Sequence, residues 1–141
     1  MLRKRFGSHH SAVLTILLDE TKNYLFAGDQ GGHIVQYSLL AETKVVKHFG
    51  NVGIGWIRAS AKFGNLAVFG GNQSQILILN ISQRTILSKL RVAIGWIYSL
   101  QFCEIPSLQN GIQILLAISG SKPDYSNFKT DLLNFTSMVQ G

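Results

Sequence analysis

One six-residue string occurs twice in the chain, and this repetition is the strongest constraint on the fold. Residues 52–57 read Val-Gly-Ile-Gly-Trp-Ile, and residues 92–97 read Val-Ala-Ile-Gly-Trp-Ile. The two copies share five of six residues and begin 40 positions apart. A match that includes both a Trp and a Gly is not expected by chance in a chain of 141 residues. The chain is therefore interpreted as an internal repeat.

Short apolar stretches separated by turn residues make up the first unit. They contain aliphatic and β-branched residues without helical spacing, which is typical of strands. The turn Asp-Gln-Gly-Gly at residues 29–32 supports this interpretation, because Gly adopts positive φ without steric cost. The strands expected in this unit are residues 11–18, 24–28, 33–39 and 42–49.

The second and third units follow the same order. In the second unit we expect strands at residues 54–60, 66–69, 75–81 and 85–90. In the third we expect strands at residues 94–102 and 112–119, joined by a longer loop at 103–111, then a loop at 122–128 and one more strand at 132–138. The string Phe-Ala-Gly-Asp-Gln at residues 26–30 aligns with Phe-Gly-Gly-Asn-Gln at residues 69–73.

The period is about 40–43 residues, with four short strands in each unit. Helical arrays of similar period need amphipathic helices, which the sequence lacks, whereas four strands per period of this length form a β-propeller blade. We therefore predict an all-β fold, a β-propeller segment of about three four-stranded antiparallel blades. The blades span approximately residues 11–50, 51–91 and 92–141, after a flexible basic segment at residues 1–10.

Three stretches resemble the WD40 repeat family. Residues 13–29 resemble its first two strands and the polar turn between them, and residues 32–39, Gly-His-Ile-Val-Gln-Tyr-Ser-Leu, resemble its third strand. Residues 116–121, Leu-Ala-Ile-Ser-Gly-Ser, are similar to its second strand. The resemblance covers about residues 9 to 121 and implies WD40-like blades and a role in protein interaction.

The chain departs from the family pattern at several positions. The Trp-Asp pair is replaced by Tyr37-Ser38 and by Leu79-Asn80, and His10 is the candidate for the family's His in the first unit. Propellers close with four to eight blades, and this chain encodes about three. Because open blades leave apolar faces uncovered, we expect either a piece of a longer propeller or a partner chain that completes the ring.

Composition limits the chemistry that the chain can perform. Hydrophobic residues make up 46% of the chain and charged residues 14%, which is unlike a disordered protein. Cys103 is the single cysteine, so we expect a free thiol and an intracellular, cytoplasmic protein, with the nucleus as the alternative. No apolar run is long enough to span a membrane, so no membrane association is expected.

The sequence contains no recognisable catalytic or metal-binding motif. The four histidines lack a spacing typical of metal ligands, and no phosphate-binding loop or nucleophile motif is present. We therefore predict neither enzymatic activity nor a cofactor nor a metal. Trp56 beside Arg58 and Trp96 near Arg91 suggest base stacking, but the Ile neighbours of each Trp favour core packing, and nucleic acid is not the expected partner.

These observations favour a non-catalytic protein–protein interaction scaffold built from WD40-like repeats. Its binding residues would lie in turns and blade junctions on one rim, where loops vary without disturbing the blades. The alternative is a nucleic-acid-associated protein, or a fragment of a propeller-type enzyme whose active residues lie outside this chain. The predicted partner-binding residues are Asp29, Gln30, His33, Asn51, Asn72, Gln73, Gln75 and Arg91.

Overall fold

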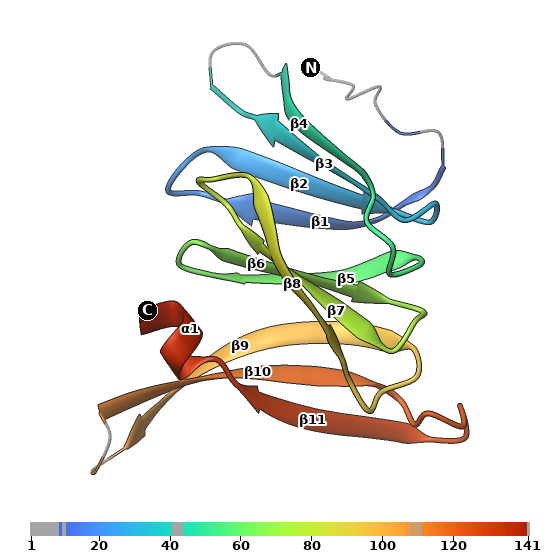
Figure 1. Cartoon of the computed structure of the whole chain (residues 1–141), viewed down its shortest axis with the longest axis vertical. Helices are drawn as coiled ribbons and strands as arrows, with labels where there is room; N and C mark the ends of the chain where they lie inside the picture. The colour runs from blue at the N-terminus through green and yellow to red at the C-terminus, as the bar shows by residue number, and fades with distance from the viewer. Residues whose placement is uncertain (1–8, 10, 41–43, 108, 110, 141) are drawn as a thin grey trace, which may run out of the picture.

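The repeated units fold into three antiparallel sheets stacked face to face (Figure 1). The computed structural model describes residues 9, 11–40, 44–107, 109 and 111–140. Strands that follow one another in the chain pair within each sheet, which confirms the predicted all-β propeller segment. Blade 1 contains β1 (Val13–Asp19), β2 (Tyr24–Asp29), β3 (His33–Ser38) and β4 (Lys44–Asn51); blade 2 contains β5 (Ile57–Phe63), β6 (Leu66–Gly71), β7 (Gln75–Asn80) and β8 (Thr85–Arg91); blade 3 contains β9 (Ile97–Ser107), β10 (Gly111–Ser121) and β11 (Phe128–Asn134).

Blade 3 differs from the prediction in having three strands. The expected loop at residues 103–111 is a continuation of the β9–β10 hairpin, which pairs as far as Ser107 and Gly111. The strand expected at residues 132–138 is present but displaced: β11 begins and ends four residues earlier, at Phe128 and Asn134, and the short helix α1 (Thr136–Gln140) follows. The Asn134 side chain accepts a hydrogen bond from the backbone N–H of Thr136, a cap that favours the helix over a longer strand.

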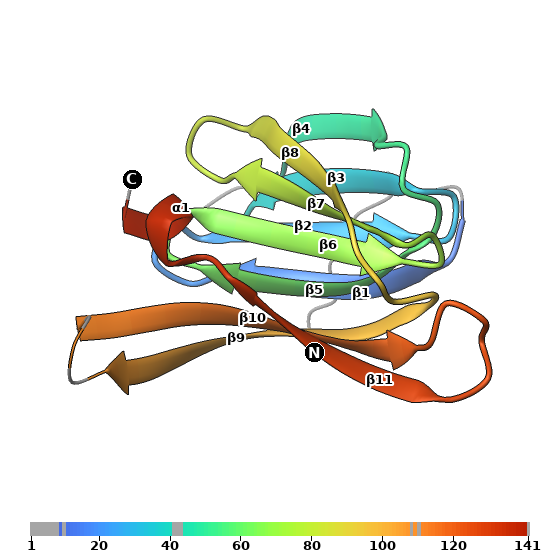
Figure 2. The same cartoon turned by 60° about the horizontal axis from the view of Figure 1, so that its bottom comes forward.

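The innermost strands of the three blades lie side by side, in the order β1, β5, β9 (Figures 1 and 2). Each has a β-bulge at the same place, near its first residue. The residues without a cross-strand partner are Leu14 in β1, Arg58 in β5 and Tyr98 in β9. A bulge bends the strand and redirects a side chain, so these three positions are directed differently from the alternation along the rest of each strand.

The repeated hexapeptide forms the two connectors between blades. Residues 52–57 lead from β4 to β5, and residues 92–97 lead from β8 to β9. The expected strand starts at residues 54 and 94 are therefore too early by three residues. In the first connector, Gly53 and Gly55 have φ of 79° and 73°, values that do not fit a strand.

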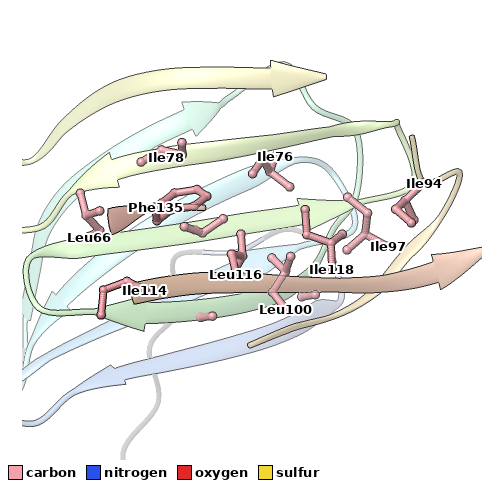
Figure 3. Packing of buried hydrophobic residues seen from close by; sticks show 13 residues of the cluster. Leu66, Ile76, Ile78, Ile94, Ile97, Leu100, Ile114, Leu116, Ile118 and Phe135 are labelled. Carbon is pink, nitrogen blue, oxygen red and sulfur yellow. The ribbon is translucent and has the colours of Figure 1, made fainter. Parts of the chain in front are cut away.

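The isoleucines of both connectors are buried between neighbouring blades. Ile54 and Ile57 pack in the apolar core between blades 1 and 2, while Ile94 and Ile97 pack between blades 2 and 3 (Figure 3). All four are fully buried. Full burial of each such side chain stabilises the fold by roughly 1.5–3 kcal/mol. The repeat is therefore conserved within the chain at the residues that join one blade to the next.

Two phenylalanines that look equivalent in the sequence are contact partners in the structure. The alignment of Phe26 with Phe69 is wrong, because the strand register makes Gly28 of blade 1 equivalent to Gly70 of blade 2, and Phe26 equivalent to Val68. A shift of one residue along a strand reverses the face. Phe26 therefore faces blade 2 and Phe69 faces blade 1, with ring centroids 5.9 Å apart.

A glycine at the second strand of a blade leaves space for the isoleucine of the next connector. A Cβ atom on Gly28 would overlap the Ile57 side chain, and a Cβ on Gly70 would lie 2.9 Å from Cδ1 of Ile97. Neither glycine has a positive φ, so the constraint is the close approach of the blades rather than backbone conformation.

We predict that Gly28→Ala lowers the free energy of unfolding by about 1–3 kcal/mol, because the added methyl group forces Ile57 and blade 2 away from blade 1. Chemical denaturation measures this change. Gly31→Ala is the comparison variant: its Cβ would meet the side chains of His33 and Ser11 in a turn and not a neighbouring blade, so it should lower the free energy of unfolding less than Gly28→Ala does. Equal stability of the two variants would contradict the close packing described here.

Candidate interaction surface

All eight predicted binding residues lie at one end of the blades, which we call the connector rim. It consists of the β2–β3 and β6–β7 turns, the two connectors and the loop at residues 122–127. Antiparallel pairing brings these segments together: His33 pairs with Asn51, and Gln75 pairs with Arg91. The 122–127 loop joins the same rim, because the Ser121 N–H donates a hydrogen bond to the Trp96 carbonyl over 2.9 Å.

The predicted residues differ in their exposure on this rim. Asn72 and Gln75 are half-buried, and Asn72 Oδ1 accepts a hydrogen bond from the Trp56 N–H over 2.9 Å. Asp29 is buried. The exposed members are Gln30, His33, Asn51, Gln73 and Arg91. Binding of a partner at these positions stays a prediction.

Asp29 organises the rim of blade 1 through both carboxylate oxygens. Oδ2 lies 2.7 Å from Nδ1 of His9, and Oδ1 accepts the His33 N–H over 2.9 Å and lies 3.2 Å from His33 Nδ1. Burial alone raises the pKa of the Asp29 carboxyl, but hydrogen bonds from His9 and His33 and the nearby imidazoles outweigh it, so the pKa is lowered from 3.8. His10, the candidate for the WD40 family's His, lies outside the described residues, and the contact with Asp29 is made by His9.

We predict that Asp29→Asn lowers the free energy of unfolding by about 2 kcal/mol near pH 6, because hydrogen bonds to a charged acceptor are lost. Since folding lowers the Asp29 pKa, ionisation contributes stability above pH 3.8, and this contribution is lost as the pH falls through the folded-state pKa. The gap between wild type and variant should therefore shrink in acid. Denaturation at several pH values measures the gap, and a gap that widens toward low pH would contradict this account.

A group of aromatic side chains surrounds one arginine near the ends of the inner strands. The Arg58 guanidinium carbon lies 5.4 Å from the ring centroid of Trp56, 6.0 Å from Trp96 and 5.4 Å from Tyr98. Further rings pack edge-on against these: Tyr125 on Trp96 at 5.7 Å, and Phe128 on Tyr98 at 6.4 Å. We call these six residues the aromatic–arginine cluster: Trp56, Arg58, Trp96, Tyr98, Tyr125 and Phe128.

The repeat itself places this cluster on the rim. Each Trp is the fifth residue of a connector, and the residue two positions later occupies the β-bulge as Arg58 or Tyr98. Gly95 allows the 122–127 loop to approach, because a Cβ there would lie 2.6 Å from the Lys122 carbonyl oxygen. That loop and the start of β11 contribute Tyr125 and Phe128 to the cluster.

The tryptophans are not core residues, so the expectation of core packing is wrong. Trp96 is 42% exposed and Trp56 is half-buried, while the flanking isoleucines fill the space between the blades. The sequence analysis did not predict the cluster, because it placed both tryptophans in the core. The signal that was available is the change of the residue after each repeat, to Arg58 and Tyr98, two residue types common in binding sites.

Positive charge predominates on the described part of the connector rim. Lys129 Nζ donates a hydrogen bond to the Ala93 carbonyl over 2.9 Å, which ties β11 to the second connector. The exposed carboxylate of the 122–127 loop, Asp124, accepts hydrogen bonds from the Ser126 N–H and hydroxyl. The cations are Arg58, Lys89, Arg91, Lys122 and Lys129.

Comparisons with known proteins identify the architecture. No protein-family model and no curated protein matches the chain. Among solved structures, the chain is similar to the WD40 β-propeller domain of Doa1 (TM-score 0.58, 14% identity), covering 89% of this chain and 42% of that one. The chain has the blade fold of a β-propeller.

Two further solved structures match with similar scores. The β-propeller domain of Cps50 (Swd1) from Myceliophteria thermophila has a TM-score of 0.56 and 10% identity, covering 89% of this chain and 40% of that one. Hydrazine synthase from Kuenenia stuttgartiensis has a TM-score of 0.56 and 13% identity, covering 96% and 50%. The chain thus spans half or less of the length of these structures. Within its described part, none of its helices is both long and apolar enough to cross a membrane.

Proposed function

We propose that the chain is a non-catalytic scaffold that binds another protein through the connector rim. The observation that carries this proposal is the composition of the rim: Trp, Tyr and Arg side chains are partly exposed on connectors, a loop and strand starts that the packed blades hold in place. These three residue types dominate the binding energy of protein interfaces. The likeness to the WD40 β-propeller domain of Doa1 and the β-propeller domain of Cps50 supports the architecture, although a shared fold does not fix function.

A second part of the proposal concerns the outward faces of the end blades. On blade 1, Ile16 and Leu18 are 63% and 45% exposed, beside a hollow of about 220 Å³ that Val13 and Tyr37 help to line. On blade 3, Leu132 is 60% exposed. Apolar faces of this kind favour further blades as neighbours. Another chain that completes the propeller would cover them.

The proposed compartment is intracellular, cytoplasmic with the nucleus as the alternative. Its support is chemical: Cys103 is a free, half-buried thiol and the single cysteine of the chain. Free thiols without disulfides are typical of proteins from reducing compartments.

We predict that combining Gln30→Ala, Gln73→Ala and Arg91→Ala removes the retention of specific proteins from an extract of the source cells by at least about fivefold, because each substitution truncates an exposed rim side chain. Quantitative mass spectrometry of the retained proteins measures the loss.

The control combines Glu20→Ala, Ser82→Ala and Gln83→Ala, three exposed turn positions at the opposite ends of the strands. It should retain the same proteins as the wild type, with or without nuclease treatment. Equal loss in both triple variants would contradict the rim as the binding surface. Loss on nuclease treatment would indicate nucleic acid instead of protein.

A further inference from the structure

We infer that the aromatic–arginine cluster binds an acidic peptide segment of the partner, with Arg58 pairing with a carboxylate and the surrounding rings receiving the apolar side chain next to it. This inference rests on the proposed function, because it names the chemistry of the segment that the scaffold recognises. It concerns residues that none of the rim substitutions above alters.

Among the residues that the structure describes, Arg58 is oriented by aromatic rings and has no acidic partner. Three rings lie within 6.0 Å of its guanidinium carbon, and they limit the directions in which the planar group can turn. Within the described part of the chain, no hydrogen bond or ion pair engages its N–H groups. A guanidinium presents its donors in a fixed fork that matches a carboxylate, so an oriented and unpaired arginine is suited to bidentate pairing.

The rings around Arg58 form an exposed apolar surface. Trp96 and Tyr98 are each 42% exposed, Tyr125 is 61% exposed, and Phe128 is 82% exposed. They come from three segments, the second connector with the start of β9, the 122–127 loop and the start of β11, yet they contact one another edge-on. A contiguous exposed aromatic patch marks an interaction site, and here it adjoins the free arginine.

Charge complementarity selects an acidic segment. Lys122 and Lys129 flank Tyr125 and Phe128 in the chain, and Lys129 Nζ also lies 3.5 Å from Asp131 Oδ2. The nearby carboxylate of Asp124 is occupied by two hydrogen bonds from Ser126. A rim with this excess of cations attracts carboxylates and repels basic segments.

The packing of the rings favours a peptide over single-stranded nucleic acid. Binding of bases requires free aromatic faces on which successive bases stack. In the cluster, Arg58 covers faces of Trp56, Trp96 and Tyr98, and Trp96 meets Tyr98 at an interplanar angle of 84°. Three of the five rings thus already carry a cation on one face, and the guanidinium of Arg58 suits a carboxylate beside an apolar side chain.

The experiment begins with selection of displayed random 12-residue peptides on the purified 141-residue chain. We expect enriched peptides to carry Asp or Glu next to an apolar residue. Binding of the leading synthetic peptide is then titrated by intrinsic tryptophan fluorescence. Because Trp56 and Trp96 are the two tryptophans of the chain and both belong to the cluster, the signal reports this site.

Arg58→Gln should weaken binding of that peptide at least tenfold, and Arg58→Lys should weaken it less, because a lysine keeps the charge but loses the bidentate fork. Arg84→Gln is the matched control: Arg84 also lies over a ring, Tyr24 at 5.8 Å, but it is in the turn before β8 at the opposite rim. It should bind like the wild type. A thermal melt of each variant shows that it is folded.

Three results would overturn the inference: enriched peptides without acidic residues, equal binding by wild type and Arg58→Gln, or tighter binding of a 20-nucleotide oligothymidine than of any selected peptide. If the protein retention described above still depends on the rim, the scaffold proposal stands and the inference alone fails. If retention also fails to depend on the rim, both fail.

Discussion

The insertion of connector isoleucines between neighbouring sheets is the contact on which the rest of the structure depends. A single blade buries one face at most, and Ile57 and Ile97 close the gap to the preceding blade at the positions where Gly28 and Gly70 leave space for them. Close packing makes such a contact sensitive to one methyl group. The repeated hexapeptide, residues 52–57 and 92–97, thus explains both the internal repeat and the stacking of the sheets.

The buried connector isoleucines also determine the positions of the residues next to them in the chain. Ile57 and Ile97 are fully buried, so the preceding Trp and the following bulge residue are held at the rim, next to a buried core. Arg58 and Tyr98 then meet across two neighbouring blades. A binding surface that arises in this way is rigid at its base, which reduces the entropy lost when a partner binds.

Much of the fold could be predicted because its turns contain Gly and Asn residues, which mark the ends of the strands. The strands of blades 1 and 2 were located to within a few residues from the Gly-rich and Asn-containing turns between them. The third blade was predicted less well, since residues 103–111 carry no alternation that distinguishes a long hairpin from a loop. The match of Phe26 with Phe69 failed because similar residues on opposite faces differ by one position in register, which local sequence similarity does not reveal.

The candidate site was also predicted only in part from the sequence. The sequence placed eight residues on one rim, because turns and strand ends that pair in antiparallel sheets must lie together. It did not reveal that the tryptophans face outward, since isoleucine neighbours are equally consistent with a core position. The β-bulges that direct Arg58 and Tyr98 into the cluster depend on strand pairing and are invisible in the residue pattern.

The central claim is that the buried connector isoleucines hold Trp56 and Trp96 at the rim, facing solvent. Its most direct test is quenching of the tryptophan fluorescence by iodide and by caesium at equal ionic strength. The structure predicts accessible tryptophans in a positively charged setting, so iodide should quench at least about twofold more strongly than caesium after each quenching constant is divided by that of free N-acetyltryptophanamide. Tryptophans that neither ion quenches, with the short-wavelength emission of a buried indole, would contradict this claim and indicate that both residues lie in the core.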